Sequence, residues 1–255
     1  MTIVKSIKVL IVLAFMLSGG VHATDAAKEQ RWADEIVDFL IDGDAVWLNA
    51  DGHEFLGIYT ESETPSDNAI IVVHGTGIHP DWEQVVQPVR VEMTTHGWNT
   101  LSIQMPILAN DAEYKDYVEI YPEVPGRFNA AIAYLHGLGI KEMVIVAHSQ
   151  GATMSSYFLS RNEHPIKGFV AIGMGATQKD SHVNSAESLK NIAIPVLDIY
   201  GSEDLEGVLK TAETRKQAAS HNNAYRQAVT EGSDHFYVGF EDQLLGSINT
   251  WLGNL

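Results

Sequence analysis

The sequence contains no cysteine, which excludes disulfides, thiolate zinc sites and a cysteine nucleophile. Basic residues are also scarce, because 16 Lys and Arg stand against 33 Asp and Glu and give a net charge of -17. A chain this acidic repels phosphate backbones, so we expect no nucleic-acid partner. Without cross-links, its stability must come from packing, for which 255 residues that are 45% hydrophobic suffice.

Long apolar runs are also few, and the first lies at the N-terminus. Lys5 and Lys8 precede the apolar stretch Val9 to Leu17, which is too short to span a bilayer comfortably. A Ser-Gly-Gly break and the small-residue site ending in Ala23 follow. We therefore predict a secretory signal peptide, residues 1–23, that is cut after Ala23, with an uncleaved anchor as the alternative. Because no cysteine stands at the site, a bacterial lipoprotein is excluded.

Residues 24–255 contain no linker-like or repeated stretch, so they are expected to form a single domain. Removal of Lys5 and Lys8 would leave 14 basic residues against 33 acidic ones, a net charge of -19. With no second apolar span after the signal, no membrane span is expected in the mature chain. A cysteine-free exported protein fits a periplasmic location.

Short apolar runs alternate with amphipathic segments along the rest of the chain. This alternation predicts an α/β fold with a mostly parallel sheet, helices on both faces and an N-terminal antiparallel hairpin around Asn49-Ala50-Asp51-Gly52. The expected strands are 45–48, 55–59, 69–73, 100–105, 143–147, 168–173, 196–200 and 224–229. The expected helices are 25–41, 81–96 with Asp81 as cap, 127–138, one after Ser149, 186–191, 205–220 and 240–252.

Ser149 lies at the most informative turn, where a buried strand changes to a helix within Ala147-His148-Ser149-Gln150-Gly151. Small residues flank the serine by two positions on each side, which is typical of a nucleophile elbow, although Ala147 replaces the usual first glycine. A serine in such a place is alternatively a helix N-cap.

A serine nucleophile needs a base and a group that orients the base. Asp204 and His235 each follow a predicted strand at the rim where Ser149 is expected, and the order Ser, Asp, His is typical of α/β-hydrolases. Asp198 and Glu203 compete with Asp204 for the acid role, and Asp204 could instead cap the next helix. A histidine base predicts activity that rises between about pH 5 and pH 8.

The sequence His74-Gly75-Thr76-Gly77 follows an earlier buried strand. Its glycines allow close approach of the backbone, so the amide of Thr76 or Gly77 is expected to join that of Gln150 as an oxyanion donor. His74, Gly75, His148 and Gly151 are expected to support this arrangement, with His148 packed beside the strand. The mechanism requires no metal and no organic cofactor.

Taken together, residues 69–252 resemble the α/β-hydrolase superfamily. More narrowly, the chain resembles a group of exported bacterial proteins in that superfamily classed as a domain of unknown function. The similar segments are Val46-Trp47-Leu48, Ile78 to Trp82, Gly97 to Ser102, Gln104 to Ala109, Tyr114 with Tyr117, and Ala147 to Gly151. The resemblance implies the fold and a hydrolase-like site, but no particular substrate.

The expected function is hydrolysis of a small neutral ester, because the acidic chain disfavours anionic substrates. A serine acyltransferase and a non-catalytic binding or structural protein of the envelope are the alternatives, whereas a dehalogenase would need a carboxylate in place of Ser149.

About twenty residues separate the strands at 168–173 and 196–200, so no large cap domain is expected there. The segment from Ile107 to Gly126 is either a lid or, as we slightly prefer, a packed surface excursion. The oligomeric state stays open.

Overall fold

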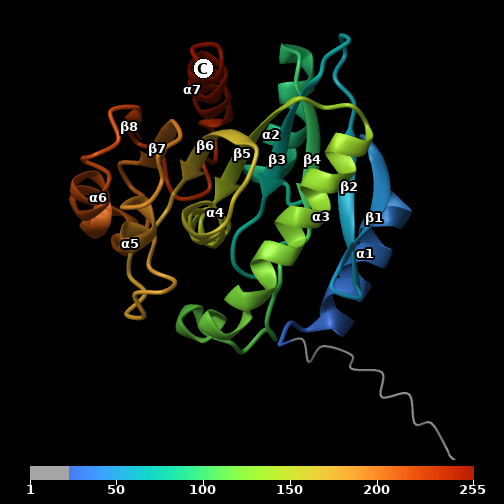
Figure 1. Ribbon diagram of the computed structural model, residues 1–255, viewed down its shortest axis with the longest axis horizontal. Coiled ribbons are helices and arrows are strands. Elements are labelled where there is room, and N and C mark those ends of the chain that lie inside the picture. The colour runs from blue at the N-terminus through green and yellow to red at the C-terminus, as the bar shows by residue number, and fades with distance from the viewer. Residues whose placement is uncertain (1–22) are drawn as a thin grey trace, which may run out of the picture.

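The computed structural model describes residues 23–255 and contains one eight-stranded sheet with the order β1-β2-β4-β3-β5-β6-β7-β8 (Figure 1). The strands are β1 Asp44–Ala50, β2 His53–Thr60, β3 Asn68–Val73, β4 Asn99–Ile103, β5 Glu142–His148, β6 Ile166–Ile172, β7 Val196–Gly201 and β8 Tyr225–Thr230. Strands β3 to β8 are parallel, while β2 pairs antiparallel with both β1 and β4. The predicted α/β class and N-terminal hairpin are confirmed.

Helices cover both faces of the sheet (Figure 1). They are α1 Ala26–Phe39, α2 Val86–Glu92, α3 Val124–Gly137, α4 Gln150–Arg161, α5 Ser185–Leu189, α6 Glu206–Ala218 and α7 Glu241–Leu252, with 3-10 segments η1 Met93–His96 and η2 Tyr114–Glu123. The larger core lies under α3, α4 and α5, and a second core lies under α2 and α7. Because the central strands are buried on both faces, their sequences read as continuous apolar runs.

The segment η2 resolves the question of the residues between Ile107 and Gly126. Tyr117, Ile120 and Tyr121 are almost fully buried in the larger core, so this part of the chain is packed against the body. Tyr114, at the start of η2, lines the pocket described below. The η2 part of the excursion is thus packed on the body, and its first residue, Tyr114, forms part of the pocket wall.

The prediction that Asp81 caps a helix running to His96 is wrong. Helix α2 begins only at Val86, after Val85 adopts a left-handed backbone with φ of 62°, and no side chain caps it. Asp81 instead forms an ion pair with the buried Arg90 at 2.5 Å. Because a buried guanidinium needs a carboxylate partner, Asp81 pairs with Arg90 from the loop before α2 and does not cap the helix.

The predicted signal peptide lies outside the described residues, apart from Ala23. Among residues 23–255, no helix is long and apolar enough to cross a membrane.

Candidate active site

Ser149 stands at the sharp turn between β5 and α4. Its φ of 54° and ψ of -121° are rare for a residue with a side chain, and such strain is concentrated at functional sites. Two glycines make room for the turn: a Cβ on Gly151 would lie 2.3 Å from the carbonyl oxygen of His74, and one on Gly75 would lie 2.9 Å from the Cβ of Ser149. The methyl group of Ala147, at the position where the motif departs from glycine, is fully accommodated inside the core.

The structure brings Ser149, His235 and Asp204 together. His235 Nε2 lies 2.9 Å from Ser149 Oγ, and His235 Nδ1 lies 2.6 Å from Asp204 Oδ1. Because an ionised carboxylate only accepts hydrogen bonds, Nδ1 carries the proton and Nε2 is left to accept from the serine hydroxyl. Three residues predicted from separate strand ends are therefore within hydrogen-bond reach in the order that proton transfer requires.

Asp204 has backbone contacts as well as its contact with His235. Its Oδ1 accepts from the Leu205 amide at 2.7 Å, and its Oδ2 lies 3.4 Å from the Gly201 amide. The N-cap of α6 is Leu205. No side chain caps α6, so Asp204 is not its cap, and the carboxylate orients His235 while it accepts from the backbone of the turn before the helix.

The competing acids have other roles or positions. Asp198 is fully buried inside β7 and binds Arg215, Tyr225 and Gln227. Glu203 lies in the turn before Asp204, where its amide donates to the Ser233 carbonyl.

His148 packs beside the strand, as predicted, and has a further contact with the site. Its Nε2 donates to the carbonyl oxygen of His235 at 3.0 Å, and the two imidazole rings lie 4.7 Å apart. Burial lowers the pKa of His148 to about 3, so the ring stays neutral. It therefore holds the loop that carries His235 without competing for the serine proton.

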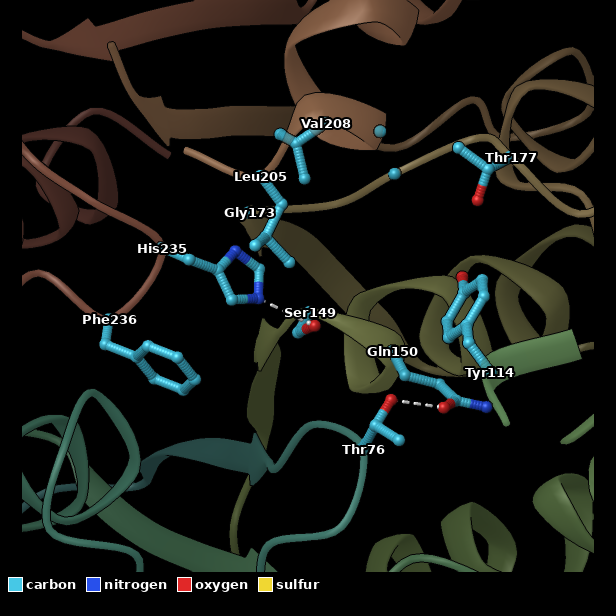
Figure 2. A pocket seen from close by; sticks show the side chains of 12 residues that line it. Thr76, Tyr114, Ser149, Gln150, Gly173, Thr177, Leu205, Val208, His235 and Phe236 are labelled. Atoms are coloured by element: carbon cyan, nitrogen blue, oxygen red, sulfur yellow. Dashed lines mark hydrogen bonds between the residues drawn. The ribbon is translucent and has the colours of Figure 1, made fainter. Parts of the chain in front are cut away.

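The predicted oxyanion segments lie on the side of Ser149 away from His235 (Figure 2). Thr76 Oγ1 donates to Gln150 Oε1 at 2.5 Å, which ties the loop after β3 to the first residue of α4. The backbone of Gly77 interacts with the hydroxyl of Tyr117, whose pKa is raised by burial. Because the Gly77 backbone already has this partner, we favour the Thr76 amide as the first predicted donor, with the Gln150 amide as the second.

His74 determines how the Thr76 amide points. The Met105 amide donates to His74 Nε2 at 2.9 Å, so the ring proton is on Nδ1, which donates to the Gly75 carbonyl at 2.9 Å. Burial lowers the pKa of His74 to about 3 and keeps it neutral. The peptide bond between Gly75 and Thr76 is trans, so fixing its carbonyl on one side aims its N–H to the other. His74 is therefore a positioning residue for the predicted oxyanion donor.

Behind His74 lies a buried chain of contacts that the sequence did not reveal. Gln104 Nε2 lies 3.0 Å from His74 Nε2, and the Gln104 carbonyl accepts from Arg127 at 3.2 Å. Arg127 in turn pairs with Glu29 of α1 at 2.8 Å. Gln104 belongs to one of the segments that resemble the family, but nothing in the spacing of residues 29, 104 and 127 indicates that they are in contact.

A cavity of about 360 Å³ opens at Ser149 (Figure 2). Its walls are mainly apolar or uncharged and include no Lys, Arg, Asp or Glu. The lining residues are Thr76, Tyr114, Ser149, Gln150, Gly173, Gly175, Thr177, Leu205, Gly207, Val208, His235 and Phe236. Within residues 23–255 no group of three or more histidine or acidic side chains is arranged to hold a metal ion.

Solved structures of other proteins share this architecture. An esterase of Pyrococcus furiosus matches with a TM-score of 0.70 and 16% identity, over 86% of this chain and 95% of that one. Est1E of Butyrivibrio proteoclasticus, solved with bound ferulic acid, matches with a TM-score of 0.66 and 14% identity, over 82% and 98%. An α/β serine hydrolase homologue of Coxiella burnetii matches with a TM-score of 0.66 and 15% identity, over 83% and 98%.

At these identities the likeness establishes the fold, and the chain has the α/β-hydrolase fold. A comparison with curated proteins finds no match. The model of a family described as protein of unknown function, DUF3530, matches residues 22–124 and 111–254.

Proposed function

Because this chain belongs to the DUF3530 family, whose description assigns no activity, we propose a function from the site itself: a serine hydrolase that cleaves carboxylic esters. The observation that carries the proposal is the continuous hydrogen-bonded series from Ser149 through His235 to Asp204, at 2.9 and 2.6 Å. The hydrolase fold and the esterase among its structural neighbours support it.

In the proposed mechanism, His235 takes the Ser149 proton as Oγ attacks the ester carbonyl. Asp204 stabilises the imidazolium that forms, and the amides of Thr76 and Gln150 bind the oxyanion. His235 then gives its proton to the departing alkoxide, which leaves an acyl group on Ser149. Water, activated by the same imidazole, attacks the acyl-enzyme and releases the acid.

The cavity favours a neutral ester with a small or medium acyl group. His235 must reach the leaving oxygen, so the alcohol part belongs near His235 and Phe236, and the acyl part belongs towards Tyr114 and Thr177 (Figure 2). A cavity of about 360 Å³ with mainly apolar walls suits acyl groups of small to medium length. Since Est1E binds ferulic acid, esters of aromatic acids belong in the same test panel.

The decisive experiment is covalent labelling of Ser149 with a fluorophosphonate probe, alongside hydrolysis of p-nitrophenyl esters of increasing chain length. The wild-type protein is expected to label and to hydrolyse, whereas Ser149→Ala should fold normally and lose activity by about four to six orders of magnitude. Ser156→Ala, a buried serine of the same helix α4, serves as the matched control. Equal hydrolysis by wild type and Ser149→Ala would refute the assignment.

A serine acyltransferase would use the same three residues but transfer the acyl group to an alcohol. Added glycerol or methanol would then yield new ester in preference to free acid, whereas a hydrolase releases mainly acid. A non-catalytic envelope protein on this fold would neither label nor turn over.

We also propose that the mature protein acts after export, most simply in a periplasm, which fractionation of expressing cells would test.

A further inference from the structure

The chain changes from exposed to buried between two adjacent residues near its beginning. Ala23 is exposed, whereas Thr24 retains 7% of its accessible surface. The Thr24 hydroxyl lies 2.5 Å from Glu29 Oε1 and accepts from the Ile107 amide at 2.9 Å. Its backbone nitrogen lies 3.1 Å from Glu123 Oε1, which also accepts from the Ala23 amide at 2.6 Å. A residue at a loose chain end rarely has so many buried contacts.

The surroundings of Thr24 are rich in negative charge. Glu29 and Glu123 both face Arg127, and both raise the pKa of its guanidinium against the larger, opposite effect of burial. His53 Nε2 lies 2.8 Å from the second oxygen of Glu29. The remaining nearby charges point elsewhere, since Asp25 caps α1 and Lys28 donates to the Leu108 carbonyl. Two carboxylates, those of Glu29 and Glu123, thus lie at the place where Thr24 presents its nitrogen.

The same cluster continues to the oxyanion loop. From Glu29, contacts run through Arg127 and Gln104 to His74, which fixes the peptide that carries the Thr76 amide. The Thr24 hydroxyl also accepts from the Ile107 amide, and the Asp25 amide donates to the Ile107 carbonyl at 2.8 Å, just beyond Met105, which donates to His74. A change in how firmly Thr24 is held therefore has two short routes to the loop.

We propose that Thr24 is a processed amino terminus with a built binding site, and that this site tightens the oxyanion loop. Hydrolysis of the Ala23–Thr24 amide by an export peptidase consumes one water, releases the carboxylate of Ala23 and leaves the amine of Thr24, which takes a proton. The new ammonium takes the place of the neutral amides of Ala23 and Thr24 beside Glu123 and adds a positive charge there. A charge-assisted hydrogen bond there is stronger than the neutral one it replaces.

The test compares two forms of residues 24–255. One begins at Thr24, and the other has Ala-Gly-Ala ahead of it, which moves the ammonium away. The form that begins at Thr24 should melt about 3–8 °C higher and hydrolyse p-nitrophenyl butyrate with a several-fold higher kcat at similar KM. Glu123→Gln should abolish both differences, while Glu119→Gln, an exposed carboxylate of the same η2, should leave them intact.

Two further variants separate the hydroxyl from the amine. Thr24→Val should lower the melting temperature of the form that begins at residue 24, and Thr24→Ser should restore it. The mass of the exported wild-type protein should correspond to a start at Thr24. Equal melting of the two forms, survival of the difference in Glu123→Gln, or a different exported terminus would overturn the site.

The link between Thr24 and the oxyanion loop rests on the proposed function, and the experiment distinguishes the failure of one from the failure of the other. Two forms that melt differently but turn over equally would overturn the link to the oxyanion loop. If neither form hydrolyses esters or takes the fluorophosphonate, the proposed function fails, while the melting comparison still decides whether Thr24 has its binding site.

Discussion

Helices α3 and α6 lie on opposite sides of α4 (Figure 1), and each carries one of the buried arginines, Arg127 in α3 and Arg215 in α6. Their exposures are 1% and 0%, and each pairs with one buried carboxylate, Glu29 or Asp198. Arg127 is connected to the oxyanion loop through Gln104. Arg215 also donates to the Val208 carbonyl at 3.0 Å, in the first turn of α6, next to the loop that carries Asp204. The site thus has two halves, each supported by its own buried ion pair. The oxyanion half is the loop from His74 to Gly77, and the acid–base half contains Asp204 and His235.

The two supports differ in how far apart in the chain their partners lie. Asp198 and Arg215 are 17 residues apart within one β7–α6 unit. Glu29 and Arg127 are 98 residues apart and join α1 to α3. The acid–base half is therefore stabilised by local structure, whereas the oxyanion half depends on the docking of the N-terminal segment. We infer that the oxyanion half is the one that chain processing, or the loss of α1, would affect.

The largest expected effect compares one histidine from each half. His235→Asn should lower kcat by about four to six orders of magnitude, because it removes the base. His74→Phe should lower kcat by about two to three orders with little change in KM, because the oxyanion amide is misaligned and the base is intact. Steady-state kinetics on p-nitrophenyl butyrate would measure both, with circular dichroism as the control for folding. Equal losses would contradict the view that His74 acts only through the loop.

The next effect compares the arginines themselves. Arg127→Met and Arg215→Met should each destabilise the fold by roughly 3–5 kcal/mol, because each leaves a buried carboxylate without its partner. Removal of the whole pair, as in Glu29→Leu with Arg127→Met, should restore part of the loss. Below the melting temperature, Arg127→Met should mainly lower kcat, whereas Arg215→Met should mainly raise KM by loosening the pocket wall at Val208. Denaturant unfolding and kinetics would measure both, and identical kinetic changes would contradict the division into halves.

The same contrast explains what the sequence could predict. All eight strands were predicted within a few residues, because buried strands read as apolar runs and their order along the chain is fixed. Ser149, Asp204 and His235 could be chosen because each follows a strand at one rim of the sheet. The position of β4 between β2 and β3 could not be read, since pairing partners leave no local mark in the sequence.

Long-range polar pairing is what the sequence concealed. Arg127 was expected only as the first residue of the helix at 127–138, and Glu29 only as a residue of the helix at 25–41. Asp81 was misassigned as a cap for the same reason, because its true partner Arg90 is identified by burial and not by spacing. The segment η2 was also missed as a helix, since its Tyr-rich sequence contains Pro122 and lacks a clear apolar period.

The smallest effect concerns acid stability and compares His74 of the oxyanion half with His148 of the acid–base half. Burial lowers the pKa of both to about 3, whereas the pKa of an unfolded histidine is about 6.5. Below pH ~6.5 the unfolded chain binds protons that the folded chain does not, so the stability present above that pH is lost as pH falls towards ~3. Each histidine should contribute about 1.4 kcal/mol per pH unit, or roughly 2 kcal/mol between about pH 6.5 and pH 5.

Unfolding by urea at about pH 7 and about pH 5 would measure this contribution directly. On acidification, the free energy of unfolding of His148→Gln should fall less than that of wild type, by the contribution of one histidine. His136→Gln, on the exposed side of α3, should behave as wild type. If the two halves respond independently, a double variant of His74 and His148 should show a reduction in pH dependence equal to the sum of the reductions in the two single variants. A pH dependence unchanged in His148→Gln would mean that His148 takes up its proton at the same pH in the folded and the unfolded chain. At acidic pH a charged ring would then lie 4.7 Å from His235 and would raise the cost of the imidazolium that catalysis must form.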